Sequence, residues 1–94
     1  MNDSTKNRIA ELREKIDAVD AELLSALNRR AGLVIEVGRI KQQQQARILD
    51  SEREALLMAR VLELNRGPLK DEMVKRLFQS IIETLKQLQS APQD

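Results

Sequence analysis

The chain has 94 residues, of which 41% are hydrophobic and 33% charged, so we expect one small helix-rich domain spanning residues 1–94. It contains no Cys or His, which excludes thiol chemistry, the usual zinc sites and imidazole catalysis, and its single aromatic residue, Phe78, argues against base-stacking surfaces for single-stranded nucleic acid. A net charge of +1 gives no general attraction to nucleic acid or an anionic membrane, and the lack of a bilayer-length apolar run or signal-peptide core predicts a cytoplasmic location.

The first predicted element is a long helix from about residue 6 to about residue 43. Its apolar residues recur at alternating intervals of three and four, the spacing of a helix-packing seam, namely Ile9, Leu12, Ile16, Val19, Leu23, Ala26, Leu33, Val37 and Ile40. Arg30 interrupts this seam. At ~1.5 Å per residue the helix would extend over ~50 Å, more than the width of a compact domain of this size, so it requires a partner surface. Residues 1–5 are expected to be a loose end, with Asp3 or Ser4 as the candidate helix cap.

Two glycines, Gly32 and Gly38, lie within the second half of the predicted long helix. Each costs ~1 kcal/mol relative to Ala in a helix interior. Two such costs so close together predict close approach by another backbone or by a ligand, and the alternative is that both glycines are simply tolerated.

A second helix is predicted after a polar loop around residues 42–49. It begins near Asp50, because Ser51 and Glu54 have the spacing of a capping box. Gly67-Pro68 ends it, since glycine adopts the left-handed conformation that follows many helices and proline does not continue one.

A third helix is predicted from Asp71, which we expect to be its cap. We expect this helix to present a broad buried stripe consisting of Met73, Val74, Leu77, Phe78, Ile81, Ile82, Leu85 and Leu88. Residues 90–94 contain Pro92 and are expected to be a loose tail. The predicted fold class is therefore all-α, with one long helix and two shorter ones.

Three basic residues near the seam of the long helix indicate how two copies would associate. Arg13 and Lys41 are 28 residues apart, a whole number of heptads, so they lie on the same side of the seam that contains Arg30. Arg13 and Arg30 are ~25 Å apart along the axis, too far to share one small ligand within a chain. Antiparallel packing of two copies would bring Arg13 of one beside residues 30–41 of the other and create two basic pockets. Each pocket would hold either a protein salt-bridge network or an anionic ligand.

The residue inventory also limits the chemistry that such a pocket would perform. The sequence suggests no nucleophile paired with a base and no metal cluster, so fixed positive charge, amides and carboxylates remain. Such groups suit a reaction in which the protein binds a small dianion, holds it in a reactive conformation and stabilises charge that develops in the transition state.

The chain resembles the all-helical AroQ-type chorismate mutases from about residue 9 to residue 89. The resemblance is carried by residues at matching spacing in all three predicted helices, namely Leu12-Arg13-Glu14-Lys15-Ile16-Asp17, Asp20, Leu23-Leu24, Arg30, Val37-Gly38, Lys41, Asp50, Glu52-Arg53-Glu54, Leu77-Phe78-Gln79 and Ile81-Ile82-Glu83. It implies an intertwined antiparallel homodimer of three-helix protomers. It also implies a Claisen rearrangement of chorismate to prephenate, in phenylalanine and tyrosine biosynthesis, without a cofactor.

The resemblance assigns roles to the cationic residues of the site. Arg13 would reach into the partner's site and, with Arg30, bind the two substrate carboxylates, and Arg53 would assist from the second helix. Lys41 would donate a hydrogen bond to the ether oxygen, where negative charge grows as the C–O bond breaks.

The remaining roles fall on the second and third helices. Gln89 would be the second donor to the ether oxygen, and helical register favours it over Gln87. Glu54, with the Asp50 backbone, would receive the substrate hydroxyl, although Glu54 also fits the capping box. The position that is often Ser in the bacterial enzymes is Leu85 here, so one carboxylate contact is missing or is supplied by backbone, water or Thr84.

Two other functions fit the same fold. One is a lyase relative that eliminates pyruvate from isochorismate, and the other is a non-catalytic helical dimer that regulates a partner enzyme of the shikimate pathway. Association or fusion with another aromatic-pathway enzyme is also consistent with the resemblance.

Overall fold

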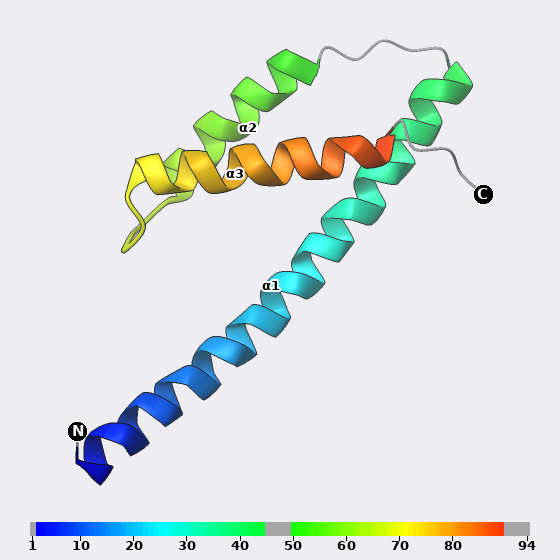
Figure 1. Cartoon of the computed structure of the whole chain (residues 1–94). Helices are drawn as coiled ribbons and strands as arrows, with labels where there is room; N and C mark the ends of the chain where they lie inside the picture. Colours follow the sequence, from blue (N-terminus) through cyan, green and yellow to red (C-terminus); the bar gives the residue numbers. More distant parts are fainter. Residues whose placement is uncertain (1, 45–49, 90–94) are drawn as a thin grey trace. The chain divides into compact units, whose positions relative to one another are not determined.

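The computed structural model describes residues 2–44 and 50–89, and within these ranges all regular secondary structure is helical. The elements are α1 (Asp3–Gln44), α2 (Asp50–Leu64), α3 (Asp71–Lys86) and the short 3₁₀ turn η1 (Gln87–Gln89), as labelled in Figure 1. The prediction of one long helix and two shorter ones is confirmed. Of the loop predicted around residues 42–49, residues 42–44 belong to α1 and residues 45–49 lie outside the described residues, as does the predicted tail over residues 90–94. None of the helices in the described ranges is long and apolar enough to cross a bilayer.

The chain divides into two compact units, Met1–Gly32 and Leu33–Asp94. The described part of the first unit is helical from Asp3, so the prediction of a loose end was wrong for residues 3–5. Asn2 caps this helix, because its Oδ1 accepts a hydrogen bond from the backbone N–H of Thr5 at 2.7 Å. The prediction of a cap at Asp3 or Ser4 was therefore wrong, since both residues are already helical.

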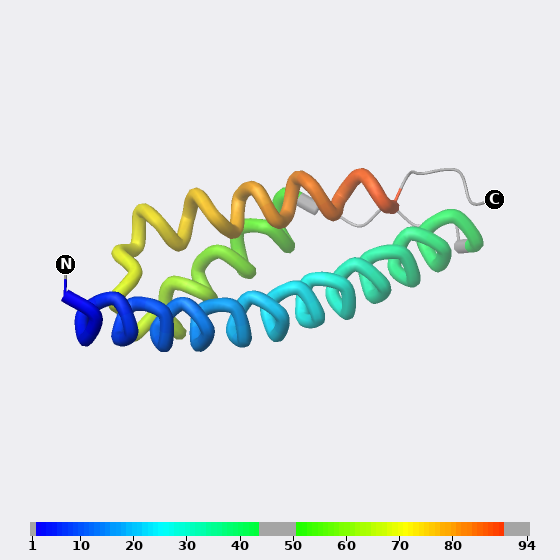
Figure 2. The backbone as a smooth tube through the Cα atoms, turned by 60° about the horizontal axis from the view of Figure 1, so that its bottom comes forward, coloured from blue at the N-terminus to red at the C-terminus, as the bar shows by residue number. Residues whose placement is uncertain are grey.

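The second unit contains the last part of α1, followed by α2, α3 and η1 (Figure 2). The turn between α2 and α3 is as predicted at Gly67, whose φ of 74° lies in the left-handed region. Asn65 holds this turn together. Its side-chain amide donates to the Leu69 carbonyl at 2.8 Å and to the Asp71 carboxylate at 3.1 Å, and its Oδ1 accepts from the Gly67 N–H at 3.1 Å.

The two shorter helices begin differently from what the capping patterns predicted. Lys70, not Asp71, occupies the N-cap position of α3, and it makes no side-chain capping hydrogen bond. Ser51 lies inside α2, whose first residue is Asp50, so Ser51 does not take the N-cap position that a capping box requires.

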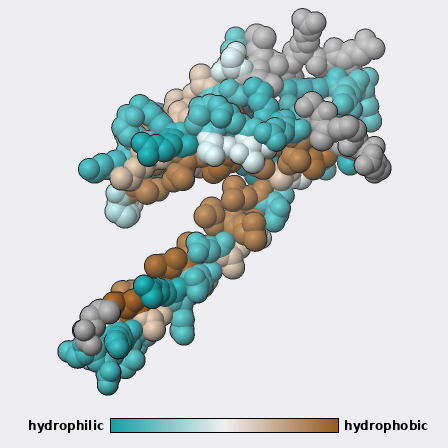
Figure 3. All heavy atoms as spheres, in the orientation of Figure 1, coloured by the Kyte–Doolittle hydropathy of each residue, from teal (hydrophilic) through white to brown (hydrophobic). Residues whose placement is uncertain are grey.

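The apolar stripe of α3 is only partly buried in the single chain. Val74 and Ile82 are 5% and 6% exposed, whereas Met73 and Leu77 are about half exposed. The expectation of a broad buried stripe was therefore wrong for one chain, because the described neighbours cover only one side of the helix. The seam of α1 is exposed as well, and its large apolar side chains, from Leu12 to Ile40, are 39–62% exposed (Figure 3).

Candidate functional site

The second unit brings together two of the predicted donors, Lys41 and Gln89. Lys41 is the last basic residue of α1, and its Nζ donates a hydrogen bond to Gln89 Oε1 at 3.1 Å. Both residues are half-buried. Gln89 lies in η1 and not on α3 as expected, because the helix tightens into a 3₁₀ turn after Lys86. The contact leaves the Gln89 amide N–H groups turned away from the cation and able to donate elsewhere.

Close packing between α1 and η1 supports this contact. Figures 1 and 2 both show the C-terminal end of α3 beside the C-terminal part of α1. Gly38 is buried, and a Cβ atom on it would lie 2.9 Å from both the Cα and the carbonyl O of Gln89. The predicted close approach at Gly38 is therefore confirmed, whereas a Cβ on Gly32 would meet no described atom within 4 Å.

Glu54 lies in an ion pair that the sequence analysis missed. Lys86 Nζ is 3.0 Å from Glu54 Oε1, and the two side chains are 48% and 31% exposed. The pair joins the end of α3 to the beginning of α2. One carboxylate oxygen contacts the ammonium group, and an ionised carboxylate retains further acceptor positions for a hydroxyl donor.

The other predicted residues of the second unit lie on α2 and α3. Arg53 is exposed on α2, next to Glu54 in sequence, and Asp50 is the first residue of α2. Leu85 is half-buried one residue before Lys86. Among the residues that the structure describes, no group of His, Cys, Asp and Glu side chains is arranged to hold a metal ion.

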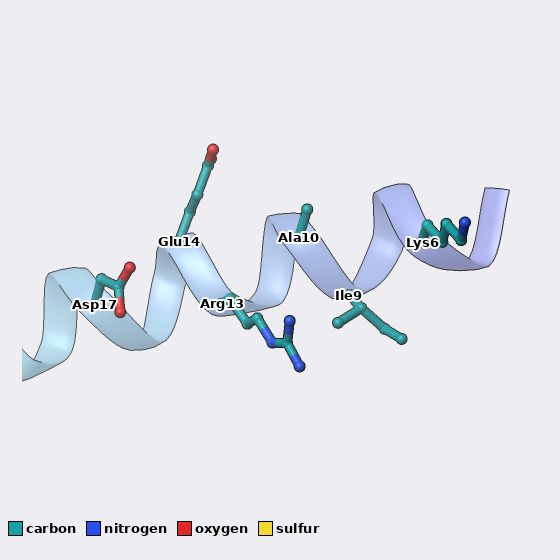
Figure 4. A pocket seen from close by; sticks show the side chains of 6 residues that line it. All are labelled: Lys6, Ile9, Ala10, Arg13, Glu14 and Asp17. Atoms are coloured by element: carbon teal, nitrogen blue, oxygen red, sulfur yellow. The ribbon is translucent and has the colours of Figure 1, made fainter. Parts of the chain in front are cut away.

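Arg13 and Arg30 lie in the first unit, both on α1. Arg13 is exposed and Arg30 is half-buried, and neither makes a hydrogen bond or ion pair with the described residues of this unit. Arg13 lines a shallow hollow whose lining side chains, drawn as sticks in Figure 4, all come from the same helix, namely Lys6, Ile9, Ala10, Arg13, Glu14 and Asp17. One helix cannot enclose a ligand, so a binding site at Arg13 needs a surface from another element.

The arrangement combines an ammonium donor, a primary amide and a carboxylate near the ends of three helices. A primary amide held by a cation through its oxygen presents N–H donors in a fixed direction, which suits stabilisation of negative charge on an oxygen atom. These features fit binding and electrostatic stabilisation better than nucleophilic chemistry.

Comparison with known proteins then identifies the family. The sequence profile described as "Chorismate mutase type II" matches residues 12–90, which is most of the chain. The chain belongs to the type II chorismate mutase family. The AroQ-type resemblance seen in the sequence is thereby confirmed.

Individual members of the type II chorismate mutase family are also similar in sequence to this chain. A protein named chorismate mutase from Methanocaldococcus jannaschii is 36% identical over 83 residues, covering 87% of this chain and 84% of that protein. The bifunctional chorismate mutase/prephenate dehydratase of Escherichia coli K12 is 38% identical over 81 residues, and that of Neisseria gonorrhoeae is 40% identical over 70 residues. The chain spans 21% and 19% of the length of these two bifunctional relatives.

Lys86 is the residue of this region that sequence reasoning did not find. A lysine in the last turn of a helix is common, because a cation is favourable near the negative end of the helix dipole. Nothing in the spacing of Lys86 along α3 therefore distinguished it from a solvent-exposed lysine. Its contact with Glu54 depends on how α2 and α3 pack.

Proposed function

We propose that this chain is a chorismate mutase, which converts chorismate to prephenate by breaking the ether C–O bond and forming a new C–C bond within the same molecule. The contact that carries this proposal is the hydrogen bond between Lys41 and Gln89, because it pairs the two groups that would donate to the ether oxygen. Membership of the type II chorismate mutase family supports the substrate and the reaction.

The proposed mechanism is electrostatic and conformational. Arg13 and Arg30 bind the two carboxylates and Arg53 assists, so that the substrate is held with its reacting carbons close together. Lys41 and the Gln89 amide donate to the ether oxygen as it gains negative charge, which stabilises the transition state more than the ground state. No covalent intermediate and no cofactor take part in these steps.

The substrate hydroxyl is proposed to donate to Glu54, with the Asp50 backbone as a second contact. Lys86 contacts one oxygen of the Glu54 carboxylate at 3.0 Å. At Leu85 the side chain offers no hydrogen bond, so this position would contact the substrate only through its backbone or its apolar surface.

We propose that the active protein is an intertwined antiparallel homodimer in which each site takes Arg13 from one chain and Lys41 from the other. Three observations support a second copy. The seam of α1 is exposed in one chain, the hollow at Arg13 is lined by a single helix, and only two apolar side chains of the described residues are buried. A second copy would cover this apolar surface, and a two-fold axis would generate two equal sites.

We also propose that residues 1–94 form one catalytic domain that acts in the cytoplasm, alone or together with an enzyme that consumes prephenate. The relatives named chorismate mutase/prephenate dehydratase carry both activities in one chain, which makes a dehydratase the natural partner.

The direct test is the loss of chorismate absorbance on adding the purified chain, with prephenate identified as the product. The matched control is a Lys41→Ala preparation made in the same way, which reports any contaminating mutase. Turnover by the wild-type chain alone supports the proposal, and no turnover above the buffer rate contradicts it. Pyruvate release from isochorismate, in place of chorismate turnover, would indicate a lyase.

A further inference from the structure

The α1 helix approaches η1 so closely at Gly38 that only a residue without a side chain fits. A Cβ atom at this position would lie 2.9 Å from Gln89 Cα, 2.9 Å from its carbonyl O and 3.3 Å from its carbonyl C. Carbon atoms pack at ~3.5–4.0 Å, so a methyl group here would displace the backbone of Gln89 by roughly half an ångström or more. The atoms in the way are backbone atoms, which cannot rotate aside as a side chain does.

The position of this contact along α1 connects it to Lys41. Gly38 and Lys41 are three residues apart and therefore lie on the same face of the helix. The η1 turn presents its backbone to Gly38 and its Gln89 side-chain oxygen to Lys41 Nζ at 3.1 Å. Gln89 thus contacts two residues, Gly38 and Lys41, on the same face of α1.

We infer that Gly38 is a positioning residue that sets the direction of the Gln89 amide by letting η1 rest directly on α1. Lys41 contacts the oxygen of that amide, so the N–H groups on the other arm of the amide remain able to donate to an oxygen atom of a bound ligand. The expected effect on kcat rests on the proposed function, because a misplaced amide donor slows the reaction only if it contacts the reacting oxygen. The expected change in the position of the Gln89 amide rests only on the contacts of Gln89 with Gly38 and Lys41.

The test compares Gly38→Ala with Gly32→Ala. Both substitutions add one methyl group to the same helix, but the methyl group at residue 32 would meet no described atom within 4 Å. The first readout is the side-chain amide signal of Gln89 in a ¹⁵N–¹H NMR spectrum, assigned by its loss in Gln89→Ala. Gly38→Ala should shift this signal, as should Lys41→Met, whereas Gly32→Ala should leave it in place. An unshifted signal in Gly38→Ala overturns the inference, and this readout requires no turnover.

The second readout is kinetic and separates positioning from general damage to the fold. Gly38→Ala should lower kcat by roughly ten-fold or more with a smaller change in KM, because the misplaced donor acts in the transition state. In the Gln89→Ala background, the same substitution should change kcat by less than about two-fold, since the group it misplaces is already absent. If Gly38→Ala lowers kcat by the same factor in the wild-type chain and in the Gln89→Ala variant, Gly38 does not act through Gln89. An inactive wild-type chain would instead count against the proposed function and leave the NMR result to decide the inference.

Discussion

Lys86 on α3 contacts Glu54 on α2 at 3.0 Å and thereby joins the last turn of α3 to the second turn of α2. The cation lies at the negative end of its helix dipole, and this position favours its charge. With side chains 48% and 31% exposed, the pair is screened by water, and it contributes at most ~1 kcal/mol to folding. We therefore expect its main effect on the direction in which Glu54 points.

Lys86→Met should raise KM for chorismate by a few-fold, roughly three to ten, while changing the free energy of unfolding by less than about 1 kcal/mol. The expected cause is that Glu54 loses the contact that orients it toward the substrate hydroxyl. Steady-state kinetics and urea denaturation measure the two quantities. Lys75→Met is the matched control, because Lys75 pairs with Glu72 at 3.2 Å within α3 alone. Equal effects of the two substitutions on KM would contradict a role for Lys86 in the site.

Lys41→Ala should lower kcat by about 10²–10³-fold with a much smaller change in KM, because its hydrogen bond strengthens as the ether oxygen gains charge. Since the substitution also removes the partner of Gln89 Oε1, stability is measured in parallel by thermal denaturation. Lys75→Ala serves as the control for loss of one positive charge. If only KM rises in the Lys41→Ala variant, the prediction is contradicted, because Lys41 would then bind the substrate and the transition state equally well.

Gln89→Glu should abolish most activity at neutral pH, because an ionised carboxylate accepts hydrogen bonds but cannot donate one to the ether oxygen. Activity should recover in part as the pH is lowered, since protonation restores a donor. The measurement is a pH profile of kcat for the variant and the wild-type chain. Gln87→Glu is the control, because Gln87 is exposed in the same 3₁₀ turn. If Gln87→Glu loses activity and Gln89→Glu does not, the donor to the ether oxygen is Gln87 and not Gln89.

Leu23→Glu should dissociate the proposed dimer and remove activity together with it. Leu23 is 53% exposed in the single chain and lies on the seam of α1, where a second copy would bury it, so a charge there would lose its hydration. Ala21→Glu is the control, because residue 21 is about 200° around the helix from residue 23 and faces away from the seam. Sedimentation velocity gives the mass of each variant. A Leu23→Glu chain that sediments and turns over like the wild type would exclude this face as the interface.

The sequence was sufficient to predict the three helices, since their periodicity and the Gly67-Pro68 turn are local signals. The argument that a glycine inside a helix needs a compensating reason was right for Gly38, whereas the structure shows no close neighbour at Gly32 among the described residues. The partner of Gly38 was not predictable, because the η1 turn has no sequence signature of its own. The Lys86–Glu54 pair was missed for a similar reason, since it depends on the register between α2 and α3.

Burial was the property that the sequence predicted least well. The apolar stripe of α3 suggested a broad buried face, but Met73 and Leu77 are half exposed in one chain. Periodicity shows which residues share a helix face, and it does not show whether the cover for that face comes from the same chain or from another.

The most direct test of a site shared between two chains is to mix Arg13→Ala and Lys41→Ala chains, each inactive alone, and to confirm heterodimers by native mass spectrometry. In each heterodimer one site would carry both substitutions and the other neither, so random exchange should restore about a quarter of wild-type activity. Heterodimers that form in the expected proportion and remain as inactive as the two parents would contradict the proposal that Arg13 and Lys41 meet across the dimer.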